Sequence, residues 1–188
     1  LMGSHLQYAN RYPSDFDYFH DMPPRAYQSQ LSSRQTDSIN QYDNSVRYTD
    51  HILGEIIKQL PQEQSTGLIF FSDHGEEVYD TTDFKGHGPE SITASMFEIP
   101  VFVWLNHQAQ VDHPDWVTGL NKAENAPTML DHIDQLISRL LGVSYADYQP
   151  QHSLGDPEWQ AHTRMVYGKD YDVQIHHSTD QTTLHTTH

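Results

Sequence analysis

An acidic residue and a histidine follow an apolar run in the middle of the chain: Asp73 and His74, in the sequence FFSDHGEE. A carboxylate oxygen and an imidazole nitrogen that meet at one point form a ligand pair typical of zinc. Neighbouring residues inside a strand point to opposite faces, but a loop containing Gly75 can direct both side chains to one centre. The dipeptide alone also fits an aspartate that caps a turn beside a surface histidine.

Two further histidines follow glycine-containing turns. His87 lies between two glycines in the sequence FKGHGPE, which fits either an exposed turn or a position that faces a ligand. His5 follows the sequence LMGS, which is either the end of a strand or a remnant of a cloning vector. If it is a strand end, His5 leaves the sheet at the same edge as Asp73 and His74, and three histidines are expected to face one site.

Hydrophobic periodicity predicts the elements that position these residues. Apolar residues at three- and four-residue steps predict a helix up to Leu60, with Asp37 or Ser38 as its N-cap. The apolar runs 68–71 and 99–104 lack alternation, so we expect strands buried on both faces of a parallel sheet. A second helical face runs from Met129 to Leu141 and is closed by Gly142.

The remaining segments are predicted to be mostly irregular. Residues 6–35 lack a sustained period and contain turns at Pro13 and at Pro23-Pro24. A polar stretch separates the second strand from the second helix, and a short strand is expected from Arg164 to Tyr167. Residues 176–188 are expected to form a disordered tail, whose histidines would bind metal only adventitiously.

Composition limits the class of protein. The chain has 188 residues, which favours one domain, and its formal net charge of −16 argues against nucleic acid or an anionic membrane surface as the main partner. It has no cysteine and 14 histidines, so a metal site must use imidazole and carboxylate ligands. No apolar run reaches the roughly 18 to 20 residues of a membrane-spanning helix, so the chain itself is expected to be soluble.

The segments LMGSHLQYANRYP, YDNSVRYTDHILGEIIKQL, FFSDHGEEVYD and GHG, followed by IPVFVW, resemble in order and spacing the bacterial phosphoethanolamine transferases. These enzymes belong to the sulfatase and alkaline-phosphatase-like superfamily. The resemblance covers residues 1–142 and identifies Gly3-Ser4-His5 as native sequence. It implies an α/β, three-layer domain with a mostly parallel central sheet flanked by helices, in which the N-terminal strands are missing. Residues 1–175 are then the C-terminal portion of the catalytic domain.

The resemblance also implies roles for the site residues. Asp73 and His74 match zinc ligands, while His5 and His87 match histidines that bind the phosphate or a second zinc ion. The nucleophilic threonine is expected upstream, so no catalytic nucleophile lies in this chain. Glu76 is expected either to support the ligands or to lie on the surface. The same is expected of Glu77. Packing roles are expected for four residues of the helix signature: Tyr42, Asp43, Asn44 and Asp50.

The implied reaction is zinc-dependent transfer of phosphoethanolamine from phosphatidylethanolamine to a lipopolysaccharide or periplasmic glycan acceptor, through a phosphorylated threonine. The intact enzyme is expected in the inner membrane, held by N-terminal helices, with its catalytic domain in the periplasm. Because the chain supplies only two primary ligands, we expect it to bind zinc weakly and to be inactive alone. An unpaired sheet edge is expected to favour self-association. The absence of cysteine favours a core-oligosaccharide or glucan acceptor over lipid A.

Two other functions are compatible with the sequence. A sulfatase or phosphatase of the same superfamily would use water as acceptor, and a sulfatase would need a Cys or Ser that is converted to formylglycine before residue 1. The chain could instead be a non-catalytic metal-binding module. Dependence of phosphoethanolamine transfer on Asp73 would exclude that second alternative.

Overall fold

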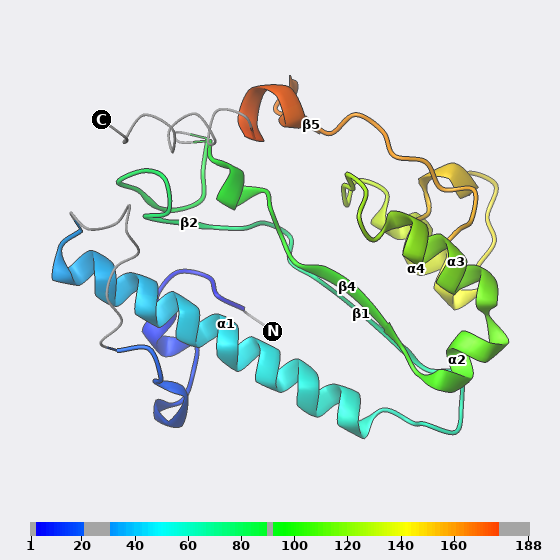
Figure 1. Cartoon of the computed structure of the whole chain (residues 1–188), viewed down its shortest axis with the longest axis horizontal. Coiled ribbons are helices and arrows are strands. Elements are labelled where there is room, and N and C mark those ends of the chain that lie inside the picture. Colours follow the sequence, from blue (N-terminus) through cyan, green and yellow to red (C-terminus); the bar gives the residue numbers. More distant parts are fainter. Residues whose placement is uncertain (1–2, 21–30, 90–91, 177–188) are drawn as a thin grey trace. The chain divides into compact units, whose positions relative to one another are not determined.

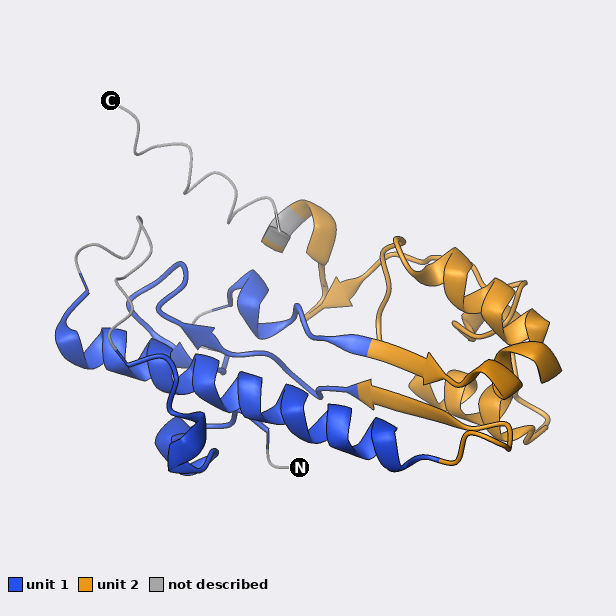
Figure 2. Cartoon of the chain, turned by 60° about the horizontal axis from the view of Figure 1, so that its bottom comes forward, with its two compact units in different colours: residues 1–60, 71–101, 178–188 blue, residues 61–70, 102–177 orange. Residues whose placement is uncertain are grey.

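The computed structural model describes residues 3–20, 31–89 and 92–176 (Figure 1). The chain forms two compact units (Figure 2). Unit 1 comprises residues 1–60, 71–101 and 178–188, and unit 2 comprises residues 61–70 and 102–177. The predicted turn at Pro23-Pro24 and residues 177–188 of the predicted tail lie outside the described residues. Within those residues, none of the helices combines the length and apolar character that crossing a membrane requires.

Unit 1 is built on helix α1, Ser33–Gln59. The helix starts earlier than the predicted N-cap at Asp37 or Ser38, because Ser32 and Gln35 form a capping box at its N-terminus. The side chain of Ser32 accepts a hydrogen bond from the backbone N–H of Gln35, and the side chain of Gln35 accepts one from the backbone of Ser32. The helix ends at Gln59, one residue before the predicted end, and Leu60 follows as its C-cap before Pro61.

Asn44 of α1 anchors the N-terminal segment of unit 1. Its side chain is fully buried, and its Oδ1 accepts hydrogen bonds from the backbone N–H groups of Tyr18 and Phe19 at 3.0 and 2.9 Å. Its Nδ2 donates to Asp17 Oδ1 at 2.9 Å and to the carbonyl of Phe19 at 3.0 Å. The predicted packing role of Asn44 is therefore confirmed, and one helix residue fixes the turn that follows the His5 segment.

The strands β1, Gly67–Phe71, and β4, Val101–Leu105, pair with each other, but they are antiparallel. The backbone N–H of Asn106 donates to the carbonyl of Thr66, and the rings of Phe70 and Phe102 lie 5.4 Å apart, so the residue numbers run in opposite directions. The predicted parallel sheet is wrong for the described strands. A parallel pair needs a crossover connection, usually a helix, and the described residues of 72–100 form no α-helix.

The prediction that these two strands are buried on both faces is also wrong. Their residues are intermediate or exposed, and the second strand starts at Val101 rather than Ile99. Pro100 directly precedes it, and proline has no N–H to donate to a sheet partner. The other described sheets are small antiparallel hairpins: β2, Glu77–Val78, pairs with β3, Lys85–Gly86, and β5, Met165–Val166, pairs with β6, Lys169–Asp170.

Unit 2 contains two helices that the sequence analysis treated as polar connection: α2, His107–Asp112, and α3, Pro114–Ala123. Each has a local start signal. Asn106 caps α2 by accepting a hydrogen bond from the N–H of Ala109 at 2.8 Å, and Pro114 begins α3, where its missing N–H costs nothing. The described chain also contains five short helical turns: η1 Tyr8–Asn10, η2 Ser14–Phe16, η4 Ala94–Met96, η5 Pro150–His152 and η6 Asp172–His176.

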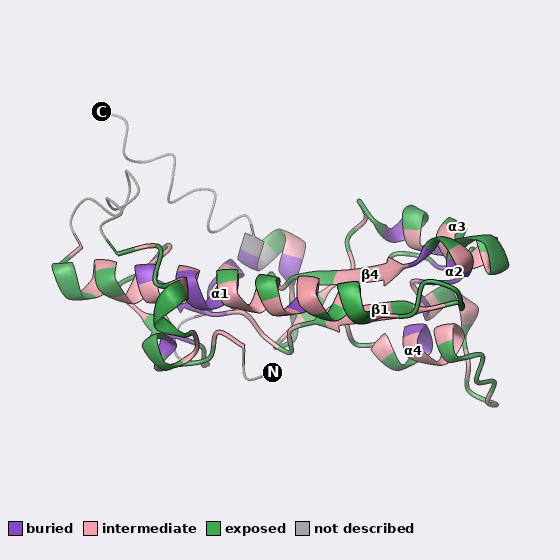
Figure 3. Ribbon diagram, turned by 90° about the horizontal axis from the view of Figure 1, so that it is seen from below, coloured by how far each residue is buried: buried purple, intermediate pink, exposed green. Residues whose placement is uncertain are grey.

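Helix α4, Ile133–Leu141, is shorter than predicted. Met129 and Leu130 lie before the turn Asp131–His132 that precedes the helix, while Gly142 closes it in the left-handed conformation, φ +66°, as predicted. Figure 3 shows buried residues on both α1 and α4. In unit 2, Leu136 of α4 is fully buried, and this core also holds three further apolar side chains: Ala109, Ala123 and Trp159.

Candidate metal and phosphate site

The loop that follows β1 is held by close backbone contacts. Ser72 Oγ donates a hydrogen bond to the carbonyl of His74 at 2.7 Å, and the N–H of Gly75 donates to the carbonyl of Met96 at 2.9 Å. A Cβ at position 75 would lie 2.1 Å from the carbonyl oxygen of Ser95. Gly75 does not have a positive φ, so the glycine is required by this close approach and not by the unusual backbone angles that the sequence analysis invoked.

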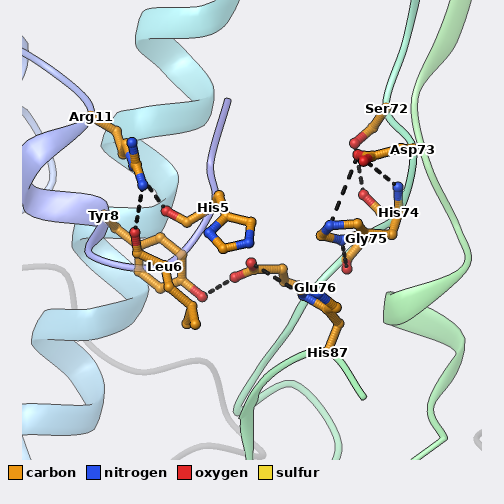
Figure 4. A network of polar contacts seen from close by, with 10 residues as sticks. All are labelled: His5, Leu6, Tyr8, Arg11, Ser72, Asp73, His74, Gly75, Glu76 and His87. Carbon is orange, nitrogen blue, oxygen red and sulfur yellow. Dashed lines mark hydrogen bonds and ion pairs between the residues drawn. The ribbon is translucent and has the colours of Figure 1, made fainter. Parts of the chain in front are cut away.

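Three histidines of unit 1 converge beside this loop (Figure 4). His5, His74 and His87 each place a ring nitrogen within 4.8 Å of the others. The ring centroids of His74 and His87 lie 3.7 Å apart, and His5 lies 6.0 Å from His74 and 5.6 Å from His87. We call this group the unit 1 histidine cluster. Its members come from the N-terminal segment, the loop after β1 and the turn after β3.

Asp73 lies next to this cluster but outside it. Its carboxylate is 87% exposed, and Oδ1 lies 3.9 Å from His74 Nε2. The same oxygen accepts a hydrogen bond from the backbone N–H of His74 at 3.2 Å. Asp73 and His74 are thus neighbours in space, and Asp73 reaches outward to solvent in this chain. The roles assigned to the two residues remain predictions.

Glu76 is a buried carboxylate beneath the unit 1 histidine cluster. It is 5% exposed, and its Oε2 accepts a hydrogen bond from the hydroxyl of Tyr8. Its Oε1 lies 3.6 Å from His87 Nδ1 and, among the described residues, is a buried atom without a hydrogen-bond partner. Buried polar atoms are almost always paired, so this oxygen indicates a position where a cation or a proton is accommodated. Of the two alternatives predicted for Glu76, the surface position is wrong, because the side chain is buried.

Tyr8 is the partner that fixes Glu76. Burial raises the pKa of the Tyr8 hydroxyl, and the hydrogen bond to Glu76 and its negative charge raise that pKa further. Tyr8 therefore stays protonated at neutral pH and donates to Glu76. Its ring also packs edge-on against Tyr42 of α1, at a centroid separation of 5.2 Å.

Glu77 is fully buried and holds the loop between β2 and η4. Its carboxylate accepts hydrogen bonds from Thr81 N at 2.7 Å, Thr82 N at 3.3 Å and Ser95 Oγ at 2.6 Å. Burial by itself would raise the pKa of Glu77, but the hydrogen bonds from Ser95, Thr81 and Thr93 together hold it below its ordinary value. Glu77 is therefore a buried anion that fixes Ser95, the residue against which Gly75 packs.

Arg11 orients the segment that carries His5. Its Nε donates to the carbonyl of His5 at 3.1 Å, and its Nη2 donates to the carbonyl of Leu6 at 3.0 Å. No role was predicted for Arg11 or Tyr8 from the sequence. Tyr8 lies far from Glu76 in the sequence, and neither residue type carries a signal for such a pairing.

The donor set of this region fits zinc. Three imidazoles lie within reach of one another, a carboxylate adjoins them at Asp73, and the orphaned Oε1 of Glu76 adds negative charge from below. Zinc in proteins takes nitrogen and oxygen ligands of this kind, with three or four protein ligands. His5, His74, His87 and Asp73 together therefore supply enough donor atoms for one zinc ion.

Comparison with known proteins identifies relatives over most of the chain. The family model described as Sulfatase matches residues 1–142. The phosphoethanolamine transferase EptC of Escherichia coli K12 is 33% identical over 187 residues, which cover 92% of this chain and 31% of that protein. The phosphoethanolamine transferase CptA of Salmonella typhimurium has the same identity and coverage. The chain thus spans about a third of the length of these curated relatives.

The fold is shared with a solved structure. The crystal structure of the C-terminal periplasmic domain of EptC from Escherichia coli, in complex with Zn, superposes with a TM-score of 0.81 at 30% identity. The match covers 94% of this chain and 51% of that one. With the family match over residues 1–142, the chain belongs to the sulfatase family and is homologous to phosphoethanolamine transferases over most of its length.

Proposed function

We propose that this chain is part of an enzyme that transfers phosphoethanolamine from phosphatidylethanolamine to a lipopolysaccharide or periplasmic glycan acceptor, with zinc as its metal. Residues 1–175 would be the C-terminal portion of the catalytic domain, whose three-layer architecture requires strands beyond those described. The observation that carries the proposal is the convergence of His5, His74 and His87 above the buried Glu76, in a chain homologous to these transferases.

Asp73 and His74 are the proposed zinc ligands, and His5 and His87 are the proposed phosphate-binding residues or ligands of a second zinc. Zinc, when bound, offsets the charge of the phosphoryl oxygens and lowers the pKa of an attacking hydroxyl. The homology to a zinc-bound EptC domain supports this metal. No threonine in this chain matches the nucleophile, so the reacting hydroxyl is proposed to lie outside it.

The residues of this chain bind and orient the substrate. His87 has its Nδ1 toward Glu76 Oε1, at 3.6 Å, which leaves Nε2 to donate to a phosphoryl oxygen. Arg11 holds the backbone of His5, so that the imidazole of His5 approaches the same group without rearrangement. Tyr8 keeps Glu76 in place beneath them, with Glu76 Oε1 facing Nδ1 of His87.

The location of the intact enzyme follows from the same homology. We propose an inner-membrane protein whose catalytic domain faces the periplasm, as the periplasmic domain of EptC does. Phosphatidylethanolamine would then be available in the adjoining leaflet, and a glycolipid or glycan acceptor in the same compartment. The isolated chain is proposed to be inactive, because its nucleophile and further zinc ligands are supplied from elsewhere.

A transfer assay on the full-length protein tests this function. The protein is reconstituted in vesicles that contain phosphatidylethanolamine labelled in its headgroup, and transfer to lipopolysaccharide is measured. We expect Asp73→Asn and His74→Gln to abolish transfer and His87→Gln to reduce kcat by about 100-fold. His113→Gln is the matched control, since His113 stacks on Trp116 in unit 2, with ring centroids 3.7 Å apart, and is expected to leave transfer unchanged.

Two results would contradict the proposal. Transfer at the wild-type rate by Asp73→Asn would remove the metal role. Release of phosphoethanolamine to water at the same rate with and without acceptor would instead favour a hydrolase of the same superfamily.

A further inference from the structure

Unit 2 contains a second group of metal-ligating side chains, which we call the unit 2 histidine cluster: Asp131, His132 and His162. One donor atom from each lies within 4.8 Å of the others. Asp131 and His132 directly precede α4, and His162 lies in the segment that follows Trp159. A fourth residue, His152 at the end of η5, stacks on His132 with ring centroids 4.1 Å apart and planes inclined by 7°.

The spacing of the donor atoms matches a tetrahedral metal site. Asp131 Oδ2 lies 3.0 Å from His162 Nε2 and 3.8 Å from His132 Nε2. Two ligands about 2.0–2.1 Å from a zinc ion, at a tetrahedral angle, are about 3.3–3.4 Å apart. The two measured separations lie on either side of that value, so small movements of the side chains bring all three donors to one cation.

Hydrogen bonding leaves the cluster incompletely satisfied. Nδ1 of His152 and Nδ1 of His162 are both buried, and neither has a hydrogen-bond partner among the described residues. Asp131 Oδ2 faces Nε2 of both His132 and His162, so two rings share one oxygen. Buried polar atoms without partners are rare in native proteins. In His162, however, Nε2 and not Nδ1 is the atom that faces Asp131. A cation is therefore indicated by the convergence of Asp131 Oδ2 with Nε2 of His132 and Nε2 of His162, and not by the unpaired Nδ1 atoms.

A hydrogen bond is the alternative explanation for these contacts. It accounts for the 3.0 Å separation of His162 Nε2 and Asp131 Oδ2, but His132 Nε2 lies 3.8 Å from the same oxygen, which is too far for a hydrogen bond. A divalent cation between the three donors accounts for both contacts. Partial exposure of the three side chains gives a cation a way in from solvent.

We propose that Asp131, His132 and His162 bind a divalent cation with the preferences of zinc. Two imidazoles and one carboxylate favour zinc, cobalt or copper over calcium and magnesium, which prefer oxygen ligands throughout. The bound ion joins the start of α4 to the segment around His162 and thereby closes the loop that contains residues 143–161. The site is a structural clip and does not depend on the proposed transferase function.

Zinc binding by the metal-free chain tests this site. Bound zinc is measured by equilibrium dialysis and titration calorimetry in a background in which the four tail histidines, His176, His177, His185 and His188, are changed to Gln. Asp131→Asn and His162→Gln are each expected to lower the zinc content by about one equivalent per chain. His113→Gln, a histidine of the same unit outside the cluster, is expected to have no effect.

A variant of the unit 1 histidine cluster separates the two sites. Changing His5, His74 and His87 together to Gln is expected to leave the unit 2 equivalent in place. The proposal is overturned if this variant loses all bound zinc, if Asp131→Asn and His162→Gln keep the wild-type content, or if the tail substitutions alone remove every equivalent.

A measurement on the unmutated ligands guards against variants that fail to fold. Zinc added to the chain with the tail substitutions is expected to slow amide hydrogen exchange in residues 143–162 and to raise the Tm, since a ligand that binds only the folded state stabilises it. Cobalt in place of zinc is expected to give the visible absorption of a tetrahedral site, and His162→Gln is expected to remove it. Unchanged exchange in residues 143–162 at saturating zinc would also overturn the proposal.

Discussion

The two histidine clusters differ in how their carboxylates are held. In unit 1, Glu76 is 5% exposed and is fixed from below by Tyr8, while its second oxygen has no hydrogen-bond partner among the described residues. In unit 2, the side chain of Asp131 is 39% exposed, and its Oδ2 faces both histidines. A buried, pre-positioned charge suits a site that must receive a substrate. A shared carboxylate between two rings suits a site that only holds chain segments together.

The support around the two clusters differs as well. The unit 1 cluster rests on a loop organised by Glu77, a fully buried anion with hydrogen bonds from several residues. The unit 2 cluster adjoins the start of α4, whose core contact is the apolar Leu136. Unit 1 is therefore expected to depend on buried charge and hydrogen bonding, and unit 2 on apolar packing.

Replacing Glu77 should produce the largest effect. Glu77→Gln removes the charge that Thr81, Thr82 and Ser95 surround, and we expect the free energy of unfolding to fall by about 3 kcal/mol. Urea unfolding measures this change, with the exposed Glu63→Gln as control. Zinc binding at the unit 2 cluster is expected to survive. A loss below about 1 kcal/mol would contradict the contrast between the units.

Acid should weaken unit 1 through the same residue. The folded-state pKa of Glu77 lies below its ordinary value, so its stabilising contribution is present above about pH 4.3, the unfolded value, and is lost as the pH falls through the folded pKa. Urea unfolding of the wild type and Glu77→Gln is compared at pH 7 and at successively lower pH. The difference between them is expected to shrink on acidification. A constant difference would show that the charge of Glu77 is not responsible.

A double-mutant cycle between Tyr8 and Glu76 should give an intermediate effect. Tyr8→Phe, Glu76→Gln and the double variant are expected to yield a coupling free energy of about 1–2 kcal/mol, because the bond is buried and one partner is charged. The parallel cycle in metal-free protein, between Asp131 and His162, is expected to give less than about 1 kcal/mol, since that pair is partly exposed. Equal couplings would remove the distinction drawn between the clusters.

The smallest effects are expected from two glycines, one directly after α4 and one inside α1. Gly142→Ala places a side chain at φ +66° after α4 and should lower the free energy of unfolding by about 1 kcal/mol. Gly54→Ala is the matched opposite: the residue lies inside α1 with nothing within 4 Å of an added Cβ, so a gain of about 0.5–1 kcal/mol is expected. Thermal unfolding measures both. Destabilisation by Gly54→Ala would contradict this interpretation.

The sequence predicted the elements whose signals are local. The α1 periodicity, the β1 run and the glycine after α4 are all short-range patterns, and each element is present in the structure. The capping box at Ser32, the Asn106 cap of α2 and Pro114 at the start of α3 are equally local signals, but the predicted elements did not include them. The predicted direction of β4 relative to β1 is wrong, because an apolar run indicates burial and carries no information on whether the neighbouring strand is parallel or antiparallel.

The sites were predictable in part for a related reason. Asp73, His74 and His87 lie near glycines in a motif that resembles a known family, and the structure brings both of those histidines together with His5. Tyr8 beneath Glu76 and the meeting of His162 with Asp131 depend on tertiary contacts between distant segments. No spacing rule links such residues, so only the folded chain reveals them.

The close approach of Gly75 to the backbone of Ser95 limits how this protein can evolve. Even a single methyl group at position 75 would collide with a peptide carbonyl, which cannot turn aside as a flexible side chain can. In a saturation mutagenesis library, every amino acid other than glycine should be depleted there. Changes that adapt the neighbouring unit 1 histidine cluster must therefore arise at other positions in the chain.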